Sequence, residues 1–495
     1  MATQARDDVP PLLAESVWTG RIFGADGWVD APGTIDVRQP ATGAVIASAG
    51  VADTATVAAS AAASARVQPA WAATSFPERM AVLRRAADLL ERHAEEITGW
   101  MLRETGSILP KIGVEITNSG NQIHQATGLA TEPLAFVLPS ATPDRTSVAH
   151  RVPAGVVGVI TPWNFPLVLA MRSLAPALAL GNTVILKSDP NTPVTGGVLL
   201  ARLFEEAGLP LGVLQVFSGG AEVGSALVED PNVAMITFTG STAAGRAVGE
   251  LAGRHLKRAV LELGGNSPLI VLEDADVDAA ASAGAFGSFL HQGQICLATS
   301  RHLVHERIAE AYVEALAERA RRLPVGDPER DEVALGPIIN EKQMQRVTRI
   351  VEGTVEQGAR LVAGGTPEGP FYPPTVLADV IPTMPAFSEE IFGPVAPVTT
   401  FRDDDEAIAL ANGVEHGLSA AIHSRSLDRA QQLAARVHSG MVHINDMTVN
   451  EESPAPFGGT GSSGNGSHFG GVANLELFTE WQWRTSRPVA TPFPF

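Results

Sequence analysis

Residues 156–166 read Val-Val-Gly-Val-Ile-Thr-Pro-Trp-Asn-Phe-Pro, an uncharged apolar run that ends in a proline-rich turn. A short run of this kind, closed by turn residues, is typical of a strand buried on both faces. We therefore predict a strand at Val156–Ile160 and a turn that carries Trp163 and Asn164. Strands buried on both faces belong mostly to parallel sheets covered by helices, so this stretch indicates an α/β fold.

Similar apolar runs recur further along the chain. We predict strands at Thr183–Leu186, Val213–Phe217 and Met235–Phe238, with helical stretches such as Val198–Ala207 between them. This alternation predicts a parallel sheet with helices on both faces, and ligands of such sheets bind beyond the carboxyl ends of the strands. A second α/β region is expected from about residue 263 to 445, beginning with a strand at Pro268–Leu272 and a helix at Ala275–His291.

Three other segments have patterns of their own. Apolar residues spaced by three and four predict one long amphipathic helix over Pro77–Gly106, ended by its glycine. The polar stretch Thr146–Arg151 and the alternating stretch Glu480–Thr485 fit neither α/β region. Together they predict an exposed β-extension, whose free edge favours pairing with another chain.

The bulk properties exclude several classes of protein. A chain of 495 residues predicts two or three lobes, and its net charge of −19 argues against nucleic-acid and anionic-membrane binding. The apolar run Val152–Met171 is interrupted by prolines and polar residues, so we predict no membrane span. Residues 1–11 carry three charges and lack the apolar region of a signal peptide. The single cysteine cannot form an internal disulfide, which favours a cytoplasmic location.

Two residues in apolar runs are candidates for chemistry. Cys296 lies in Gly293-Gln294-Ile295-Cys296-Leu297-Ala298, where it is either an inert core thiol or a nucleophile that needs a lowered pKa. Glu262 lies in Leu261-Glu262-Leu263-Gly264-Gly265-Asn266. It is either solvated at a strand end or a general base whose pKa is raised by apolar surroundings.

Three further features suit a phosphate-bearing ligand or a developing negative charge. The stretch Gly240–Gly245 follows a predicted strand and opens a helical run, so its free N–H groups either bind phosphate or form an ordinary capped helix start. Lys187 follows a strand, where its ammonium either reaches a ribose or phosphate or is solvated. Asn164 either donates to an oxyanion or only forms a turn.

In their order and spacing these residues resemble the aldehyde dehydrogenase superfamily, from about residue 17 to the end of the chain. Glu262 and Cys296 lie 34 residues apart, as in the family pattern. A closer likeness, to the benzaldehyde dehydrogenase branch, rests on residues 245–258, 289–296 and 443–446. The motifs that match the superfamily are Pro162-Trp163-Asn164-Phe165-Pro166, Phe238-Thr239-Gly240-Ser241-Thr242, Glu262-Leu263-Gly264-Gly265-Asn266, Gly293-Gln294-Ile295-Cys296, Glu389-Glu390-Ile391-Phe392-Gly393-Pro394 and Pro456-Phe457-Gly458-Gly459.

The resemblance implies a fold and an activity. The fold would be α/β, with a parallel-sheet cofactor-binding domain (1–130 and 152–262), an α/β catalytic domain (263–472) and a β-hairpin oligomerisation extension (131–151 and 473–495). The activity would be NAD(P)-dependent oxidation of an aldehyde to a carboxylic acid through a cysteine thiohemiacetal and thioester. The implied assembly is a homodimer or homotetramer, and no metal site is expected.

The resemblance also implies residue roles. Cys296 would be the nucleophile, Asn164 and the backbone N–H of Cys296 would hold the oxyanion, and Glu262 would activate the hydrolytic water. The residues implied in cofactor binding are Ile160, Trp163, Lys187, Gly240, Ser241, Gly245, Leu263, Glu390 and Phe392. The residues implied in an apolar substrate tunnel, suited to an aromatic aldehyde, are Phe165, Ile295, Leu297 and Phe457.

One departure from the family bears on the cofactor. Many members read Lys-Pro-Ser-Glu where this chain has Lys187-Ser188-Asp189-Pro190, and that Glu normally accepts the adenosine ribose hydroxyls. Pro190 has no carboxylate, so we expect NADP to be tolerated. We expect NAD to be preferred, because a 2′-phosphate would be penalised by Asp189 if that side chain points inward. Two alternatives stay open. One is a CoA-acylating dehydrogenase, against which Glu262 argues because thiolysis needs no water-activating base, and the other is a non-catalytic binding protein on the same fold.

Overall fold

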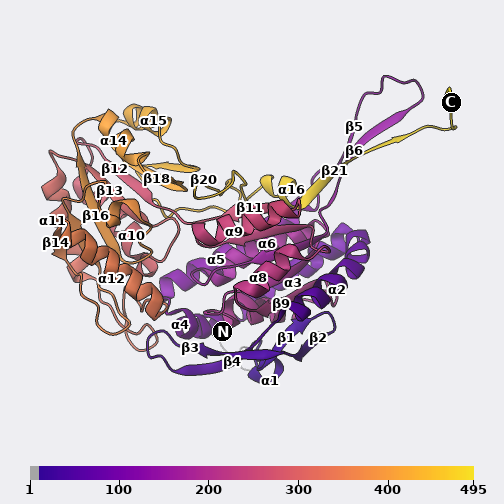
Figure 1. The fold of residues 1–495 in the computed structure, drawn as a ribbon, viewed down its shortest axis with the longest axis horizontal. Helices are drawn as coiled ribbons and strands as arrows, with labels where there is room; N and C mark the ends of the chain where they lie inside the picture. Colours follow the sequence, from indigo (N-terminus) through magenta and orange to yellow (C-terminus); the bar gives the residue numbers. More distant parts are fainter. Residues whose placement is uncertain (1–9) are drawn as a thin grey trace, which may run out of the picture.

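The computed structural model describes residues 10–495, which contain four sheets, the smallest of them a two-stranded pair. The nine-stranded first sheet has a parallel centre in the order β11-β10-β7-β8-β9, seen in the right-hand body of Figure 1. The predicted strands are confirmed as β7 (Val156–Ile160), β8 (Thr183–Ser188), β9 (Leu214–Ser218) and β10 (Met235–Thr239). The other strands are β1 (Arg21–Gly24), β2 (Gly27–Asp30), β3 (Gly33–Arg38), β4 (Val45–Val51) and β11 (Arg258–Glu262).

Helices cover both faces of this sheet, as the alternation predicted. On one face the buried core contains α3 (Phe76–Arg92), α4 (Ala94–Thr105), α5 (Leu109–Leu129), α6 (Pro166–Ala179) and α7 (Leu199–Glu206). On the other face it contains α2 (Thr54–Ala73), α8 (Ala221–Glu229) and α9 (Thr242–Arg254). The register pairs Ile160 with Lys187 and Thr239 with Glu262, so the carboxyl ends of β7, β8, β10 and β11 lie at one edge.

The prediction of one helix over Pro77–Gly106 is wrong in its middle. The chain leaves helical geometry at His93, with φ −99° and ψ 15°, and divides the segment into α3 and α4. Apolar spacing continues through both helices, so the pattern carries no sign of the break. Gly106 ends α4 with φ 63°, a left-handed conformation that glycine adopts readily.

The second sheet occupies the left-hand body of Figure 1, in the order β14-β15-β16-β13-β12-β18-β19. Only β14 and β15 pair antiparallel. One face carries α10 (Val277–Phe289) and α11 (Ala309–Arg322), and the other carries α12 (Glu341–Glu356), α14 (Asp404–Ala411) and α15 (Leu427–Ala434). The strands are β12 (Ser267–Val271), β13 (Thr299–His305), β14 (Arg360–Ala363), β15 (Thr375–Ala378), β16 (Val395–Phe401), β18 (Ser419–His423) and β19 (Met441–Ile444).

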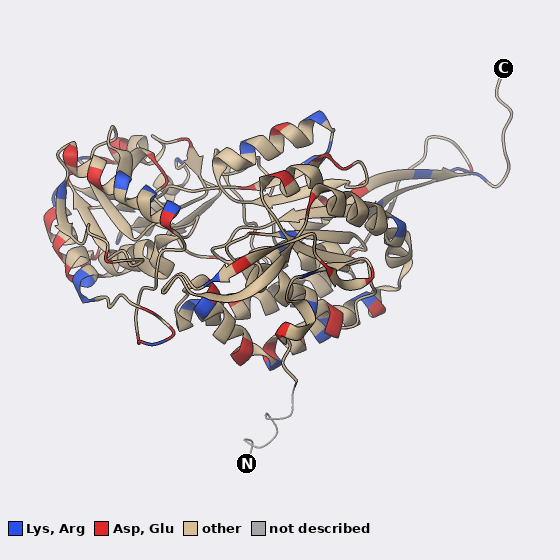
Figure 2. Ribbon diagram, turned by 60° about the horizontal axis from the view of Figure 1, so that its bottom comes forward, with Lys and Arg blue, Asp and Glu red and all other residues tan. Residues whose placement is uncertain are grey.

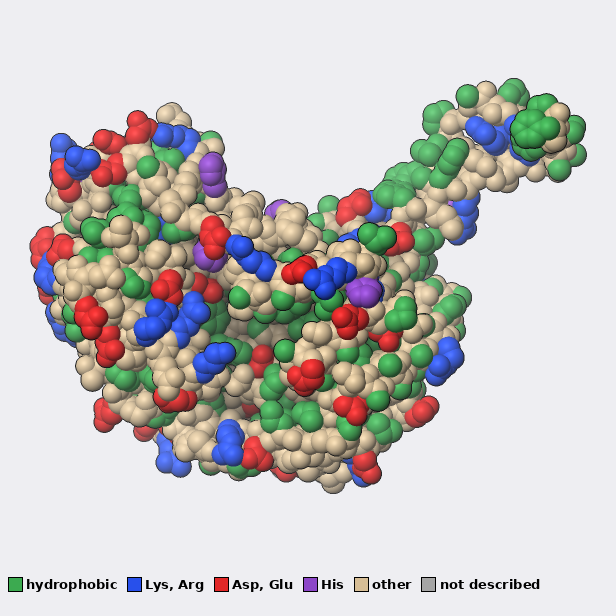
Figure 3. Space-filling view, in the orientation of Figure 1, with side chains coloured by type: hydrophobic (Ala, Val, Ile, Leu, Met, Phe, Trp, Pro, Cys, Tyr) green, Lys and Arg blue, Asp and Glu red, His purple; other side chains and the backbone are tan. Residues whose placement is uncertain are grey.

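The predicted β-extension is a three-stranded arm that projects from the first body (Figure 1). It consists of β5 (Ala135–Val137), β6 (Thr146–Pro153) and β21 (Thr479–Ser486), so it is larger than the predicted hairpin. β21 pairs antiparallel with β6 over eight residues, from Thr479 opposite Pro153 to Ser486 opposite Thr146. Apolar side chains gather along this arm in Figure 3, and Trp483 is 65% exposed.

The division into domains stays a prediction. The remaining elements are short. They are α1 (Glu15–Trp18), α13 (Pro385–Ser388), α16 (Ala473–Phe478), β17 (His416–Gly417), β20 (Thr460–Gly461) and the helical turns Val194–Val198 and Leu290–Gly293. Acidic and basic residues are interspersed over both bodies (Figure 2). Within residues 10–495, no helix is both long enough and apolar enough to cross a membrane.

Candidate active site

Three connected cavities lie between the two bodies, and two of them meet at Cys296. The first, called the long cavity, has a volume of about 820 Å³ and is lined by Ile160, Lys187 and Gly240 among others. The second, the central cavity, is about 150 Å³ and shares Trp163 and Gly240 with the first. The third, the tunnel, is about 310 Å³ and shares Asn164 and Cys296 with the central cavity. The central cavity therefore connects the long cavity with the tunnel, and Cys296 lies where the central cavity meets the tunnel.

The N-terminus of α9 opens into the long cavity. Ser241 is its N-cap, and its hydroxyl accepts a hydrogen bond from the Ala244 N–H at 3.3 Å. Gly240 and Ser241 line the cavity, as expected of a phosphate site at a helix N-terminus. Gly245 does not line it. A Cβ on Gly245 would lie 2.1 Å from the Leu263 side chain, so this glycine allows α9 to pack closely on Leu263.

The far end of the long cavity carries Lys187, Asp189 and Pro190. Burial lowers the pKa of Lys187, while the charges of Asp189 and Glu222 act in the opposite direction. One Asp189 carboxylate oxygen accepts hydrogen bonds from the backbone N–H and side-chain amide of Asn191, at 2.9 and 2.7 Å. Asp189 is therefore held in its own turn rather than placed as a substitute for the missing glutamate.

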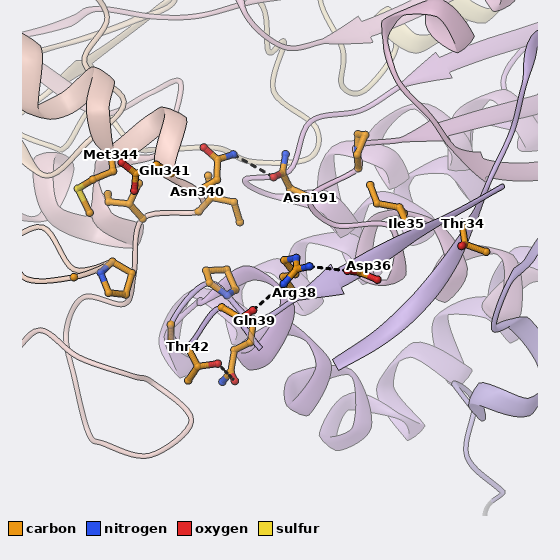
Figure 4. A pocket seen from close by; sticks show the side chains of 18 residues that line it. Thr34, Ile35, Asp36, Arg38, Gln39, Thr42, Asn191, Asn340, Glu341 and Met344 are labelled. Atoms are coloured by element: carbon orange, nitrogen blue, oxygen red, sulfur yellow. Dashed lines mark hydrogen bonds and ion pairs between the residues drawn. The ribbon is translucent and has the colours of Figure 1, made fainter. Parts of the chain in front are cut away.

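A larger cleft lies on the other side of Pro190 (Figure 4). It is about 910 Å³ and lies between β3, with the turn that follows, and the segment 338–344. The side-chain amide of Asn340 donates to the Asn191 side chain across it at 3.1 Å. None of the predicted site residues lines this cleft, so its size does not make it the reaction site.

The central cavity is built from residues of both bodies. Glu390 accepts a hydrogen bond from the Gly265 N–H at 2.9 Å, and burial raises the pKa of Glu390 to about 6. Trp163 and Phe392 meet edge to face, with ring centroids 5.4 Å apart. Phe392 has a φ of 57°, a strained value for a non-glycine residue that fixes the direction of its ring. Leu263 lines the same cavity.

The tunnel brings together all four residues predicted for an apolar substrate. Phe165, Ile295, Leu297 and Phe457 line it together with Cys296. Ile295, Leu297 and Phe457 also belong to one buried apolar cluster, against which Phe165 packs. The tunnel wall is thus mainly hydrocarbon, which suits an apolar ring.

Polar residues also line the tunnel, and the sequence analysis did not identify them. They are Lys111, Asn118, Arg172, Asn450 and Glu451. Arg172 is the only charged residue of α6, in which all fourteen residues are buried. A lone charge in an apolar helix is a sequence signal, because burying a charge is costly unless it is paired.

Asn164 lies in the turn between β7 and α6, beside Cys296. Its side-chain amide donates one hydrogen bond to the Gln294 carbonyl at 3.0 Å, which orients the group. Asn164 is 4% exposed and lines both the central cavity and the tunnel. An amide carries two N–H donors, so one stays available for an oxygen beside Cys296.

The segment that leads to Cys296 is held in an unusual conformation. His291, Gln292 and Gly293 all have positive φ, at 49°, 57° and 65°. The Gln292 side chain fastens the segment by donating to the Pro337 carbonyl at 2.7 Å. Positive φ at two consecutive non-glycine residues is costly and is maintained only by surrounding contacts. The thiol is therefore presented by a loop of fixed shape.

The electrostatic setting of Cys296 differs from the expected thiolate. Burial, followed by the charge of Glu262, raises the pKa of the Cys296 thiol to about 12, and Arg172 only partly offsets this. The thiol is therefore neutral at pH 7 and must lose its proton to a base before or during attack. Glu262 is 1% exposed, and burial raises its pKa to about 8. It is close enough for its charge to act on the thiol.

Sequence comparison identifies the family. A model of the aldehyde dehydrogenase family matches residues 28–484. A vanillin dehydrogenase of Amycolatopsis is 55% identical over 485 residues, covering 98% of this chain and all of the relative. A benzaldehyde dehydrogenase [NAD(+)] of Pseudomonas putida is 50% identical over 482 residues, covering 97% of this chain and 99% of the relative.

Comparison with solved structures shows the same fold. A salicylaldehyde dehydrogenase from Pseudomonas putida, complexed with salicylaldehyde, superposes with a TM-score of 0.92 at 35% identity. That match covers 96% of this chain and 99% of the other. An NAD-dependent benzaldehyde dehydrogenase from Corynebacterium glutamicum superposes with a TM-score of 0.87 at 40% identity, covering 96% and 98% of the two chains.

Proposed function

The chain belongs to the aldehyde dehydrogenase family, and from this premise we propose that it oxidises an aromatic aldehyde to the carboxylic acid with NAD. The observation that carries the proposal is the central cavity, which connects with the long cavity at Trp163 and Gly240 and with the apolar tunnel at Asn164 and Cys296. Relatives that are 50% and 55% identical are named for benzaldehyde and vanillin, which are both aromatic aldehydes.

The long and central cavities fit a dinucleotide. Gly240 and Ser241 offer a helix N-terminus to the pyrophosphate, and Lys187 offers a cation near the adenosine end. Glu390 and Phe392 would hold the nicotinamide ribose and ring beside Cys296, with Trp163, Leu263 and Ile160 as apolar walls. When bound, NAD accepts the hydride that leaves the substrate carbon.

The first chemical step is attack by the Cys296 sulfur on the aldehyde carbon. The thiol proton passes to the Glu262 carboxylate, and a carbon–sulfur bond forms as the carbonyl oxygen becomes an oxyanion. The free N–H of the Asn164 amide and the backbone N–H of Cys296 donate to that oxyanion. Loss of hydride from the tetrahedral carbon then leaves a thioester on Cys296.

The second step is hydrolysis of the thioester. Glu262, after releasing the thiol proton, removes a proton from water as the water oxygen attacks the acyl carbon. The carbon–sulfur bond breaks, the thiolate takes up a proton, and the carboxylic acid leaves through the tunnel. A base with a pKa of about 8 is well matched to this task near neutral pH.

We expect the tunnel to favour aromatic over short aliphatic aldehydes. Benzaldehyde should have a kcat/KM at least about tenfold higher than acetaldehyde, because Phe165 and Phe457 bury the ring and each buried methylene contributes about 0.8 kcal/mol. Steady-state NADH formation, measured without CoA, checks this. A preference for acetaldehyde contradicts the substrate class, and a requirement for CoA contradicts hydrolysis.

The same assays with NADP address the cofactor. NADP is expected to be tolerated, because Pro190 lacks the carboxylate that would repel a 2′-phosphate. NAD is expected to be preferred, because a relative that is 50% identical is named for NAD(+). One Asp189 oxygen is engaged by Asn191, which weakens its effect on that phosphate. A cytoplasmic location stays a prediction from the single cysteine.

We also propose that the β-extension assembles the chain into a homodimer or homotetramer. Trp481 and Trp483 are 51% and 65% exposed on β21, and exposed apolar surface of this kind favours association. Trp483→Glu should shift the molar mass toward that of a monomer in light scattering, whereas Trp483→Phe should not. A monomeric wild-type protein would contradict this assembly.

A further inference from the structure

A buried ion pair lies in the wall of the tunnel, next to the proposed chemistry. Arg172 Nη2 lies 2.6 Å from Glu451 Oε1, and the Arg172 side chain is 2% exposed. The guanidinium also packs over the Phe457 ring, 3.8 Å from its centroid. α6 carries Arg172, and the segment between β19 and β20 carries Glu451. The pair therefore connects the first body to the segment that closes the tunnel.

This pair is not explained by stability alone. Arg172 Nε and Nη1 have no hydrogen-bond partner among residues 10–495, and neither has Glu262 Oε1. Unpaired buried donors and a buried charge both lower the stability of a protein. Replacing a buried ion pair by an apolar pair of similar volume is often neutral or stabilising. A costly charge beside a catalytic acid is typical of a functional arrangement.

The charges around the two reacting groups have a simple pattern. The Glu262 carboxylate accepts a hydrogen bond from the backbone of Gly459, two residues after the Phe457 ring on which Arg172 packs. Arg172 is therefore the cation that acts on Glu262, and Glu451 is the like charge. Cys296 feels Glu262, Glu390 and Glu451 as acids and Arg172 as its cation. Arg172 lowers the pKa of both groups, and Glu451 raises both. The two members of the ion pair therefore shift the pKa values of Glu262 and Cys296 in opposite directions.

We propose that Arg172 and Glu451 are positioning residues that set the ionisation of Glu262, and with it the pH range in which the thioester is hydrolysed. Arg172 favours the carboxylate form of Glu262, and Glu451 limits that effect while holding the guanidinium in place. The inference rests on the proposed function, because it assigns Glu262 the role of base.

Substrate recognition is the competing role for Arg172. A guanidinium in a tunnel wall can donate to an oxygen on an aromatic ring. However, the two unpaired donors, Nε and Nη1, are buried, and the third nitrogen is paired with Glu451. The geometry therefore favours an action on Glu262 through space over direct contact with the ring.

The test is the pH dependence of kcat for benzaldehyde oxidation in two variants that change the charge in opposite directions. Arg172→Met removes the cation, so Glu262 should ionise at higher pH and the acid limb should move up by about one unit or more. Glu451→Gln removes the like charge, so the acid limb should move down. Arg172→Lys keeps the charge and should stay nearer to wild type than Arg172→Met.

Controls separate this effect from general damage and from failure of the proposed function. Arg322→Met removes one member of the exposed Arg322–Glu318 pair on α11 and should leave the profile unchanged. The proposal is overturned if the acid limbs of the two test variants move in the same direction, or if kcat falls equally at every pH. A loss confined to ring-hydroxylated aldehydes overturns it in favour of recognition. If Arg172→Met does not fold, Glu451→Gln alone decides, and an unshifted pH profile of that variant overturns the proposal. A wild-type protein that is inactive on every aldehyde refutes the proposed function instead.

Discussion

Cys296→Ala is expected to lower kcat/KM for benzaldehyde by about 10⁴-fold or more, because removing a nucleophile leaves only binding and oxyanion stabilisation. No second cysteine exists in the chain to replace it. The variant should keep its affinity for NAD, since the long cavity is lined by other residues. NADH formation at 340 nm and a fluorescence titration with NADH measure the two quantities.

The matched control for this variant is Cys296→Ser. Serine replaces the thiol by a hydroxyl of similar size, which is a far weaker nucleophile. The activity of this variant should therefore also be very low. Full NADH formation by either variant would show that the reaction does not pass through this sulfur.

Glu262→Gln is expected to form about one NADH per site in a burst and then to slow by about 10²- to 10⁴-fold. The reason is that hydride transfer precedes hydrolysis. In the variant the thiol proton can still pass to solvent, so acylation is slowed but completed, whereas the water that attacks the thioester has lost the base that activates it. Glu390 and Glu451 also line the cavities that contain Cys296, but each is engaged, Glu390 by the Gly265 N–H and Glu451 by Arg172. Stopped-flow absorbance resolves the burst from the steady rate.

The pH dependence of the wild type follows from the same group. The pKa of Glu262 is raised to about 8, so the basic carboxylate form is populated above that pH and lost below it. The steady rate should therefore rise with pH through about 8, and Glu262→Gln should lack this limb. Glu389→Gln, at a surface carboxylate paired with Arg349, is the control and should keep it. An unchanged steady rate in Glu262→Gln would remove Glu262 from the role of base.

Much of the site was predictable because its residues follow strands. Asn164 follows β7, Lys187 lies in the last two residues of β8, and Glu262 ends β11. The shared edge of a parallel sheet brings such positions together. The motif at Gly240 was predictable for a similar reason, since a strand followed by a capped helix has a local signature. The structure places Asn164, Lys187 and Gly240 along connected cavities, whereas Glu262 is buried and lines none of them.

Other features depend on contacts that no local pattern records. Gly245 lies in the same motif but packs under Leu263, because side-chain direction around a helix start is set by tertiary packing. The break at His93 leaves the apolar period intact, so it has no sequence signal. The neutral state of the thiol depends on burial and on the charge of Glu262, which is distant in sequence. Arg172 and Glu451 are nearly 280 residues apart, so their pairing appears only in the fold.

The most direct test of a thioester on Cys296 is the mass of the intermediate trapped on the Glu262→Gln variant. The variant is mixed with benzaldehyde and NAD, quenched in acid during the burst, and analysed by intact mass and peptide mapping. We expect one added benzoyl group per chain, located on Cys296. A burst of NADH with no acyl group on Cys296, or with the acyl group on another residue, would contradict it.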